Sequence, residues 1–152
     1  MDPIEERLQT SQPIENRRER AMLNIFHTGN TLRNRINDCL KSFELTDPQY
    51  NVLRILRGQR GKPMNLFEVG DRMVHRESNV SRIVDKLEAK GLVQRKEDPA
   101  NRRRVDITIT EAGLAALGAI QPLLDEEIRF CFDGLDAAQI EVLCELLDKI
   151  QA

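Results

Sequence analysis

The sequence predicts a mainly α-helical fold with one small β-hairpin, for three reasons. Apolar residues recur at helical spacing over most of the 152-residue chain. Strict alternation of apolar and polar residues, typical of a half-buried strand, is confined to residues 105–110. Capping and turn residues mark the element ends, with no linker or repeat that separates domains. We therefore expect a single domain over residues 1–152, with helical regions 13–41 and 112–152 around a central unit, 46–110.

A long amphipathic helix is expected over residues 13–41. One side of it collects Met22, Ile25, Phe26, Gly29, Leu32, Ile36 and Leu40. With about 28 residues and about 1.5 Å of rise per residue, the helix is roughly 42 Å long, which exceeds the usual reach of a compact domain of this size. Its length therefore implies a partner surface.

The next helix is predicted to begin near Thr46. Thr46, Asp47 and Pro48 form a helix-start signal, and apolar positions continue up to a glycine-rich turn at residues 57–63. These apolar positions are Tyr50, Val52, Leu53, Ile55 and Leu56. We expect this helix to pack against the rest of the central unit.

Residues 64–110 are predicted to form a helix, a turn, a second helix and a two-stranded ribbon. The second helix, expected over residues 77–90, has an apolar stripe for burial: Val80, Ile83, Val84 and Leu87. Its opposite edge has short polar side chains first and cationic ones further along: Ser78, Asn79, Ser81, Arg82 and Lys86. Such groups bond base edges and phosphates, although an ordinary solvated helix face is the plain alternative. Lys90 and Gly91 are expected to end the helix.

The ribbon is expected to carry arginines at its tip. Val93 leads into a short strand, and residues 105–110 form the return strand. Between them, residues 97–104 (EDPANRRR) hold an Asp-Pro pair and an Asn, which are turn formers. We predict that this segment is the apex and continues neither strand. We expect minor-groove or phosphate contacts for Arg102, Arg103 and Arg104. The alternative is that these arginines serve solubility alone.

A helix-turn-helix followed by a basic ribbon is the layout of a winged helix-turn-helix, whose helix fits the major groove of duplex DNA and whose ribbon reaches the adjacent minor groove. The charge distribution agrees with DNA as a partner. The net charge is −2, yet residues 72–104 contain ten Lys or Arg against five Asp or Glu, whereas residues 105–152 contain two against ten. The acidic C-terminal region is therefore expected to face away from the DNA.

Two amphipathic helices are predicted at the C-terminal end. The first opens at residues 110–113, and the second is capped by Asp136. Pro122 is expected to bend or break the first helix, because proline lacks a backbone donor. The apolar faces hold Leu114, Leu117, Ile120, Leu123, Leu124 and Ile128 in the first helix, and Ile140, Leu143, Cys144, Leu147 and Ile150 in the second.

These faces, together with the first long helix, exceed what one winged unit of this size buries. A symmetric homodimer removes the surplus, because a twofold interface buries the same patches from both copies. Such a dimer is expected to bind a pseudo-palindromic operator in double-stranded DNA, with its recognition helices one turn apart, roughly 34 Å. A monomer with a larger helical core is the alternative.

Three segments together resemble the MarR family of bacterial transcription regulators: residues 45–56, 78–93 and 98–113. With the order of the flanking helices, the resemblance spans nearly the whole chain. Its most specific element is the wing, where an Asp, basic residues and a strand ending in Leu-Thr are typical. This chain has Asp98, the arginines and a strand ending in Ile109 and Thr110, so Ile replaces Leu.

A second departure from the family lies at His75, Arg76 and Glu77, where many relatives have a small capping residue. The exact start of the recognition helix is therefore left open. The resemblance implies that Arg103 contacts the minor groove and that Asp98 braces the wing arginines. It also implies that the major groove is faced by Ser78, Asn79, Ser81 and Arg82.

The resemblance further implies control by a small-molecule effector, often an aromatic or lipophilic anion. Such an effector would bind in a crevice between the dimerisation helices and the winged unit and shift the population of DNA-binding states. Repression relieved by the effector is the commonest outcome in the family, and activation is also known. The residues expected to line the crevice are Phe26, His27, Asn30 and Tyr50.

Three cysteines without CxxC spacing predict neither a disulfide scaffold nor a zinc site: Cys39, Cys131 and Cys144. A redox-sensing regulator of the same fold would need a thiol with a lowered pKa. Cys39, beside Arg35 and Lys41, is the candidate for that alternative. His27 and His75 lack acidic or thiol partners in the sequence, so no metal or other cofactor is expected.

Other classes of protein fit the sequence less well. It has no glycine-rich phosphate loop, nucleophile elbow or carboxylate pair that would predict an enzyme. It has no apolar run near the ~20 residues of a membrane helix and no secretory stretch, so we expect a cytoplasmic protein without membrane contact. A winged-helix module that binds an acidic protein is the closer rival. The polar residues Ser78, Asn79 and Ser81 suit base edges better than the centre of a protein interface.

Overall fold

A computed structural model of the chain describes residues 4–74, 79–98 and 101–151, and for residues 97, 98 and 101–104 it describes the backbone alone. The described elements follow one another as α1 (Ile4–Arg7), α2 (Arg17–Lys41), α3 (Asp47–Gly58), β1 (Met64–Asn65), α4 (Leu66–Asp71), α5 (Val80–Ala89), β2 (Val93–Asp98), β3 (Asn101–Ile109), α6 (Glu111–Cys131) and α7 (Ala137–Gln151). The predicted class, mainly helical with a small β-hairpin wing, is confirmed.

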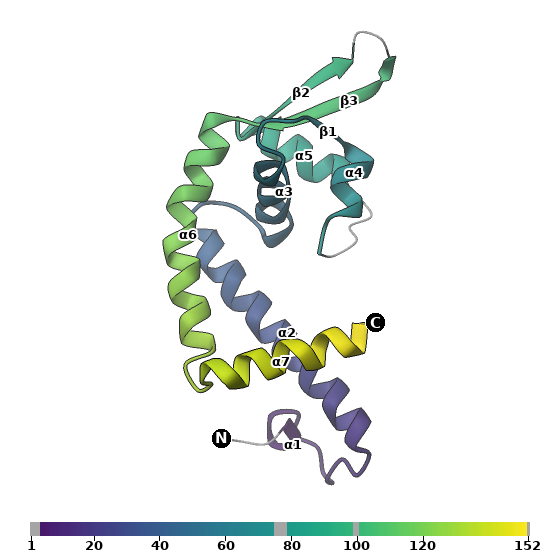
Figure 1. Ribbon diagram of the computed structural model, residues 1–152, viewed down its shortest axis with the longest axis vertical. Helices are drawn as coiled ribbons and strands as arrows, with labels where there is room; N and C mark the ends of the chain where they lie inside the picture. The colour runs from purple at the N-terminus through teal and green to yellow at the C-terminus, as the bar shows by residue number, and fades with distance from the viewer. Residues whose placement is uncertain (1–3, 75–78, 99–100, 152) are drawn as a thin grey trace.

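The molecule has two ends of different character (Figure 1). One end holds a winged unit made of α3, β1, α4, α5, β2 and β3, from which the β2–β3 hairpin projects. From this unit α2 and α6 extend side by side, and their Cα atoms approach closely along the shared stretch. The other end holds α1, α7 and the far half of α2.

Side-chain caps fix where several helices begin. The Thr46 backbone N–H donates to Gln49 Oε1 at 3.0 Å, which places the start of α3 where the sequence predicts it. Before α7, the Gln139 N–H donates to Asp136 Oδ1 at 2.8 Å and the Gln139 side chain accepts from the Asp136 N–H, so Asp136 caps the last helix as predicted. Thr110 caps α6 by accepting from the Gly113 N–H at 3.1 Å.

The first long helix begins later than the sequence predicts. Asn16 accepts hydrogen bonds from the N–H groups of Arg18 and Glu19, so α2 begins at Arg17 and not near residue 13. The short helix α1 precedes it and was not predicted. Glu5 of α1 pairs with Arg20 of α2 at 2.7 Å, and this pair holds α1 against α2.

The sheet has three antiparallel strands in the order β1-β3-β2, where the sequence predicts two. Met64 of β1 pairs with Ile107 of β3, and two paired residues are too few to give an alternating pattern. The prediction that residues 97–104 continue neither strand is wrong. Asp98 is the partner of Asn101 after a register shift, so β2 runs to Asp98 and β3 begins at Asn101. The three wing arginines therefore belong to β3.

The core lies within the winged unit and the adjoining halves of α2 and α6. Fully buried side chains from each element meet there, including Leu40, Val52, Leu53, Leu56, Val69, Val84, Leu87, Ile107, Leu117 and Ile120. The apolar residues predicted for α3 all join this cluster, with Ile55 partly buried. This core fixes the orientation of α5, whose buried stripe is the predicted one.

A close approach of backbones joins the sheet to α6. A Cβ atom on Gly113 would lie 2.3 Å from the Leu92 carbonyl oxygen, so only glycine fits there. The Thr110 N–H also donates to Leu92 O at 3.1 Å. Gly91 just before it has φ +71°, the left-handed conformation that ends α5. The end of α5 and the start of α6 are thus held together.

Helix α6 continues through Pro122, so the predicted break does not occur. Ile120 and Leu124 are buried on either side of the proline, and their packing holds the helix where a backbone hydrogen bond is missing. No helix in the described part of the chain is long and apolar enough to span a membrane.

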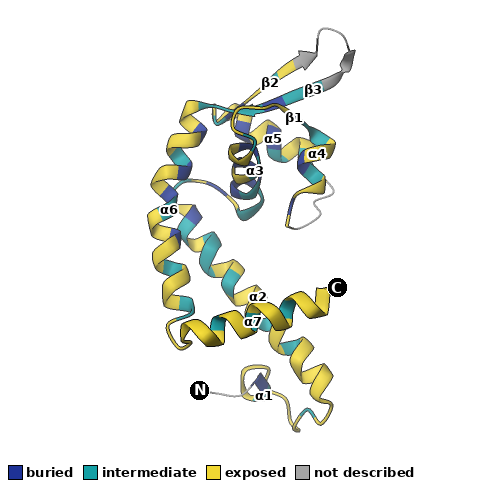
Figure 2. Cartoon of the chain, in the orientation of Figure 1, coloured by how far each residue is buried: buried dark blue, intermediate teal, exposed yellow. Residues whose placement is uncertain are grey.

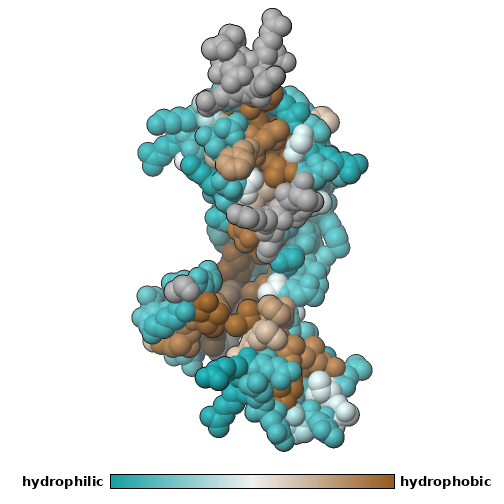
Figure 3. All heavy atoms as spheres, turned by 90° about the vertical axis from the view of Figure 1, so that its right-hand side faces the viewer, coloured by the Kyte–Doolittle hydropathy of each residue, from teal (hydrophilic) through white to brown (hydrophobic). Residues whose placement is uncertain are grey.

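At the end away from the hairpin, most of α7 is coloured as exposed in Figure 2, and several of its exposed residues are apolar. Helix α7 has no buried residue, and Val142, Leu146 and Ile150 form an exposed stripe along it at i, i+4 and i+8. On the face drawn in Figure 3, apolar residues gather in this half of the molecule as well as on the winged unit. Phe26, Leu123 and Ile128 on α2 and α6 are also exposed.

Candidate nucleic-acid interface

Helix α5 presents a polar edge to solvent. Val84 and Leu87 are fully buried, which turns the opposite side outward. Three of the residues predicted to contact DNA are exposed on this helix: Ser81, Arg82 and Lys86. Arg82 and Lys86 are one turn apart, so their cationic ends share one surface of the helix. This edge offers hydrogen-bond donors and positive charge on a rigid element.

Asn79 has a local role that the sequence did not predict, in addition to its predicted DNA contact, which stays a prediction. Its Oδ1 atom accepts the Arg82 backbone N–H at 3.2 Å, so Asn79 is the N-cap and α5 begins at Val80 and not near residue 77. The carbonyl oxygen of its side chain is thereby used within the protein. Ser78, also predicted to contact DNA, lies outside the described residues.

The wing is placed by the backbone of β2 and β3, which project together beyond the core (Figure 1). The predicted minor-groove residues Arg102, Arg103 and Arg104 belong to β3, and Asp98 ends β2. Their side chains lie outside what the structure describes, so the groove contact and the bracing role of Asp98 stay predictions.

Arg95 of β2 connects the wing to the recognition helix and was missed from the sequence. Its Nη2 atom lies 2.6 Å from Asp85 Oδ1 and also donates to the Ser81 carbonyl oxygen at 3.1 Å. The Arg95 backbone N–H donates to Glu88 Oε1 at 3.2 Å. Its buried Nε makes no hydrogen bond and lies 3.7 Å from Glu88 Oε2.

The alternation of side chains along a strand could have predicted the direction of Arg95. It is two residues from the buried Val93 on the same strand, so both side chains point to the face that α5 covers. A cation on that face needs a partner, and Asp85 and Glu88 supply one on the adjacent edge of α5.

Two contacts fasten the recognition unit to the preceding elements. Asn51 Oδ1 accepts the Val74 backbone N–H at 3.1 Å, which ties the segment after α4 to α3. The Lys90 ammonium donates to the Glu44 carbonyl oxygen, which ties the end of α5 to the loop before α3. The position of α5 is thus fixed at its C-terminal end, and the segment that leads toward it is held against α3.

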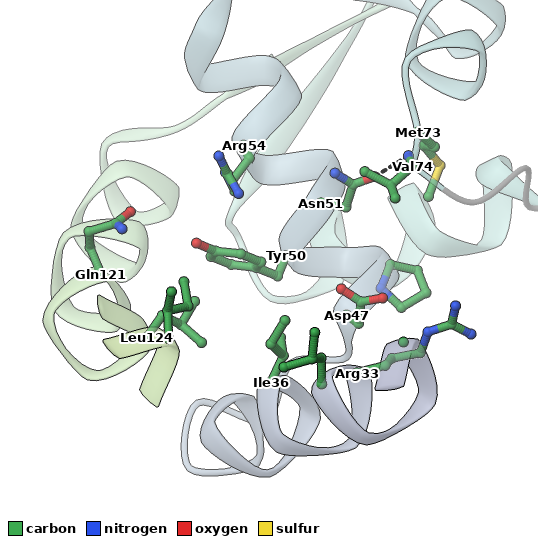
Figure 4. Close-up of a pocket in the computed structure, with 14 residues that line it drawn as sticks. Arg33, Ile36, Asp47, Tyr50, Asn51, Arg54, Met73, Val74, Gln121 and Leu124 are labelled. Atoms are coloured by element: carbon green, nitrogen blue, oxygen red, sulfur yellow. Dashed lines mark hydrogen bonds between the residues drawn. The ribbon is translucent and has the colours of Figure 1, made fainter. Parts of the chain in front are cut away.

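A cavity of about 350 Å³ lies between α2, α3 and α6, with Met73 and Val74 closing one side (Figure 4). Tyr50 is buried, and its hydroxyl points toward α6. The Arg54 guanidinium lies 5.9 Å from the centroid of the Tyr50 ring. Charged residues on the lining are Arg33, Asp47 and Arg54, and much of the remainder is apolar. The cavity therefore combines apolar walls with two cations and one carboxylate.

The residues predicted to line an effector crevice are separated by the structure. Tyr50 lines the main cavity. Phe26 and Asn30 line a neighbouring hollow, which shares Gly29 and Arg33 with the main cavity. His27 lines neither hollow, because its position on α2 lies on another side of the helix from Gly29 and Arg33. The four residues therefore do not share one hollow in the described chain, and their role in binding an effector stays a prediction.

The surroundings of Cys39 oppose the alternative of a redox sensor. Burial raises the pKa of the Cys39 thiol, and the carboxylates of Glu127 and Asp38 act in the same direction. Arg35 pairs with Glu127 at 2.6 Å and Lys41 pairs with Asp38 at 2.6 Å, so both neighbouring cations are neutralised. A low-pKa thiolate is not favoured at this position. Across the described ranges, no three His, Cys, Asp or Glu residues gather as a metal site.

Comparisons with known proteins agree with this geometry. The family model described as the MarR family matches residues 45–105, from the loop before α3 to the wing. An uncharacterized HTH-type transcriptional regulator of Bacillus anthracis is 31% identical over 115 residues, which are 75% of each chain.

Two solved structures have a similar fold. One is a mutant MarR from E. coli complexed with operator DNA, with a TM-score of 0.75, 22% identity, and coverage of 84% of this chain and 91% of that one. The other is BpsR of Bordetella bronchiseptica, whose DNA binding is regulated by 6-hydroxynicotinic acid, with a TM-score of 0.78, 24% identity, and coverage of 91% and 98%. At these identities the likeness shows the fold alone.

Proposed function

Because this chain belongs to the MarR family of DNA-binding transcription regulators, we propose that it acts as a homodimeric repressor whose operator binding is relieved by a small-molecule effector. The observation that carries the proposal is the division of the molecule. The cationic edge of α5 and the wing lie at one end, and uncovered apolar faces lie at the other.

The DNA contacts are assigned to both parts of the winged unit. Arg82 and Lys86 are exposed on α5, where a recognition helix meets base edges and phosphates in the major groove. Ser81 is exposed on the adjacent edge of α5 and is able to donate or accept a hydrogen bond. The arginines of β3 are assigned to the adjacent minor groove, with Arg103 as the principal contact. The E. coli MarR complex with operator DNA supports this arrangement by its fold.

The dimer is assigned to α2, α6 and α7. The stripe of Val142, Leu146 and Ile150 is uncovered within one chain, and twofold pairing would bury it in both copies. The acidic residues from Asp125 to Asp148, in the second half of α6 and in α7, then lie away from the DNA, toward the end opposite the hairpin. Two recognition helices in such a dimer would read half-sites about one helical turn apart, roughly 34 Å.

The effector is assigned to the cavity between α2, α3 and α6. Its volume falls within the range of about 300 to 1,000 Å³ that is usual for small-molecule sites. Arg33 and Arg54 favour an anion, and the apolar walls favour an aromatic or lipophilic one. BpsR, which shares the fold, is regulated by 6-hydroxynicotinic acid. An effector that prefers a spacing of recognition helices unsuited to the operator would lower DNA affinity by its differential affinity for the two states.

In vitro selection from random duplexes with the purified full chain tests the proposal. We expect enrichment of a pseudo-palindromic sequence, with binding that weakens steeply as salt rises, by about 0.9 log units per log unit of salt for each phosphate contacted. Failure to enrich any sequence would contradict the assignment of α5 and the wing to DNA. The same holds if an acidic protein partner displaces duplex DNA from this surface. Release of the selected duplex by 6-hydroxynicotinic acid or another aromatic carboxylate would identify the effector class.

A further inference from the structure

Arg95 is a cation in the DNA-binding unit that points inward. Its side chain is 24% exposed, and its contacts fall on Ser81, Asp85 and Glu88 of α5. These three residues are spaced at i, i+4 and i+7, so they lie on one side of α5, where one guanidinium reaches all of them. The edge that it follows is next to the one that exposes Arg82 and Lys86.

The contact between Arg95 and α5 lies at the base of the wing. Arg95 is opposite Ile107, which also pairs with Met64 of β1. Beyond the next residue pair, Lys96 and Asp106, β1 has ended and the hairpin continues as two strands. A two-stranded ribbon is marginally stable by itself. Arg95 is therefore bonded to α5 near the last point at which the wing has support from a third strand.

The charges around Arg95 oppose a direct role in binding phosphate. Asp85 and Glu88 are both paired with it, so its positive charge is offset within the protein. A guanidinium that turned toward DNA would leave these two carboxylates facing phosphates, and that repulsion is unfavourable.

We propose that Arg95 is a positioning residue that fixes the wing against the recognition helix, so that both reach neighbouring grooves of one duplex together. The inference rests on the proposed DNA contacts of α5 and the wing. Arg95 would preorganise the wing, because a wing already held in the orientation that fits DNA loses less conformational freedom on binding. Sequence preference at the wing positions then depends on a residue that touches no DNA.

The decisive variant is Asp85→Asn, which removes a negative charge from an exposed helix position while leaving Arg95 in place. If Arg95 acts by position, Asp85→Asn weakens binding to the selected duplex by about three- to tenfold despite the lower repulsion, and Arg95→Ala weakens it by about tenfold or more. The double variant is then no weaker than Arg95→Ala alone, because both changes break one contact. The matched control is Asp71→Asn on α4, which removes the same charge elsewhere in the unit and is expected to bind at least as well as the parent.

Two readouts separate positioning from a general loss of stability. Repeated selection with each variant is expected to keep the preference at positions read by α5 and to lose it at flanking positions read by the wing. Hydrogen exchange of the free protein is expected to be about tenfold faster at the outer amides of β2 and β3, with the core amides unchanged.

Opposite results overturn the inference. If Asp85→Asn strengthens binding while Arg95→Ala weakens it, Arg95 is a phosphate contact. If both variants keep the parent's affinity, selection profile and hairpin exchange, Arg95 has no positioning role. If the parent itself selects no duplex, the proposed function fails, and the exchange measurement on the free protein still decides whether Arg95 holds the wing.

Discussion

The side-chain oxygen of Asn51 accepts a hydrogen bond from the Val74 backbone N–H at 3.1 Å. Asn51 belongs to α3 and Val74 to the segment between α4 and α5, and both residues also line the cavity between α2, α3 and α6. The contact therefore joins the wall of the proposed effector site to the turn of the helix-turn-helix. A ligand that moves this wall would act on the chain leading into the recognition helix.

Asn51→Ala is expected to weaken operator binding because it frees this segment. The loss of one hydrogen bond should lower the free energy of unfolding by about 1 kcal/mol, a small change beside the effect on DNA. Urea unfolding and duplex titration measure the two effects. Asn51→Asp keeps an acceptor oxygen and serves as the control. Equal DNA affinity in Asn51→Ala and the parent would show that this contact does not position the turn.

Gly113→Ala is expected to destabilise the fold by about 1 to 3 kcal/mol, because the added Cβ would lie 2.3 Å from the Leu92 carbonyl oxygen. Thermal or urea unfolding measures the change. Gly118→Ala in the same helix is the matched control, since its Cβ meets nothing within 4 Å, and it should stabilise α6 by up to about 1 kcal/mol. Equal stabilities of the two variants would contradict the close approach at Gly113.

Substitutions of Asn79 distinguish its role as a helix cap from a role in base recognition. Asn79→Ala should destabilise α5 by about 1 kcal/mol through loss of the cap, whereas Asn79→Ser keeps a capping oxygen. If Asn79 also reads bases, the Ser variant folds like the parent but selects a different operator sequence. Unfolding curves and repeated selection give the two readouts. An unchanged selected sequence in Asn79→Ser would leave Asn79 as a cap alone.

Much of the architecture followed from the sequence because helix starts and the alternating strand have local causes. Gln49 accepts the Thr46 backbone N–H at the start of α3, Asp136 caps α7, and Ile107 alternates with polar neighbours along one strand. Strand β1 was missed because its two residues pair only across the fold. The wing arginines were placed at an apex because turn formers precede them, but pairing of Asp98 with Asn101 extends the strands.

The candidate site was less predictable than the fold. The exposed edge of α5 follows from helical periodicity, so Arg82 and Lys86 were identified correctly as exposed residues. The hydrogen bond from the Arg82 N–H to the Asn79 side chain depends on where α5 starts, and the sequence left that start open. The cavity depends on how α2 and α6 cross, so side chains near in sequence, such as Phe26 and His27, were grouped without a shared wall.

Cys39 is expected to be a slow nucleophile. Burial and nearby carboxylates raise the pKa of its thiol, so less thiolate is present at neutral pH, and the rate of alkylation should rise only at more alkaline pH than for an unhindered cysteine. Iodoacetamide labelling of the native protein across pH, followed by mass spectrometry, measures this rate against glutathione. Faster labelling of Cys39 than of glutathione at neutral pH would revive the redox alternative.

Leu146→Glu is expected to convert the proposed dimer to a monomer. Leu146 is 53% exposed in the middle of the uncovered stripe on α7, and a carboxylate there would be buried without a partner in a dimer. Sedimentation velocity measures the change in mass. Glu145→Gln, at the neighbouring exposed position, is the control and should stay dimeric. A Leu146→Glu protein with the parent's mass would place the interface elsewhere.

The central claim, that a cationic wing and the edge of α5 bind one duplex together, is tested most directly by titrating the selected operator over a range of salt concentrations. Arg103→Ala is compared with the parent and with Arg129→Ala, an exposed arginine of α6 at the other end of the molecule. The account predicts lower affinity for Arg103→Ala and a salt slope smaller by about one unit, with Arg129→Ala like the parent. Identical affinity and slope for Arg103→Ala and the parent would contradict it.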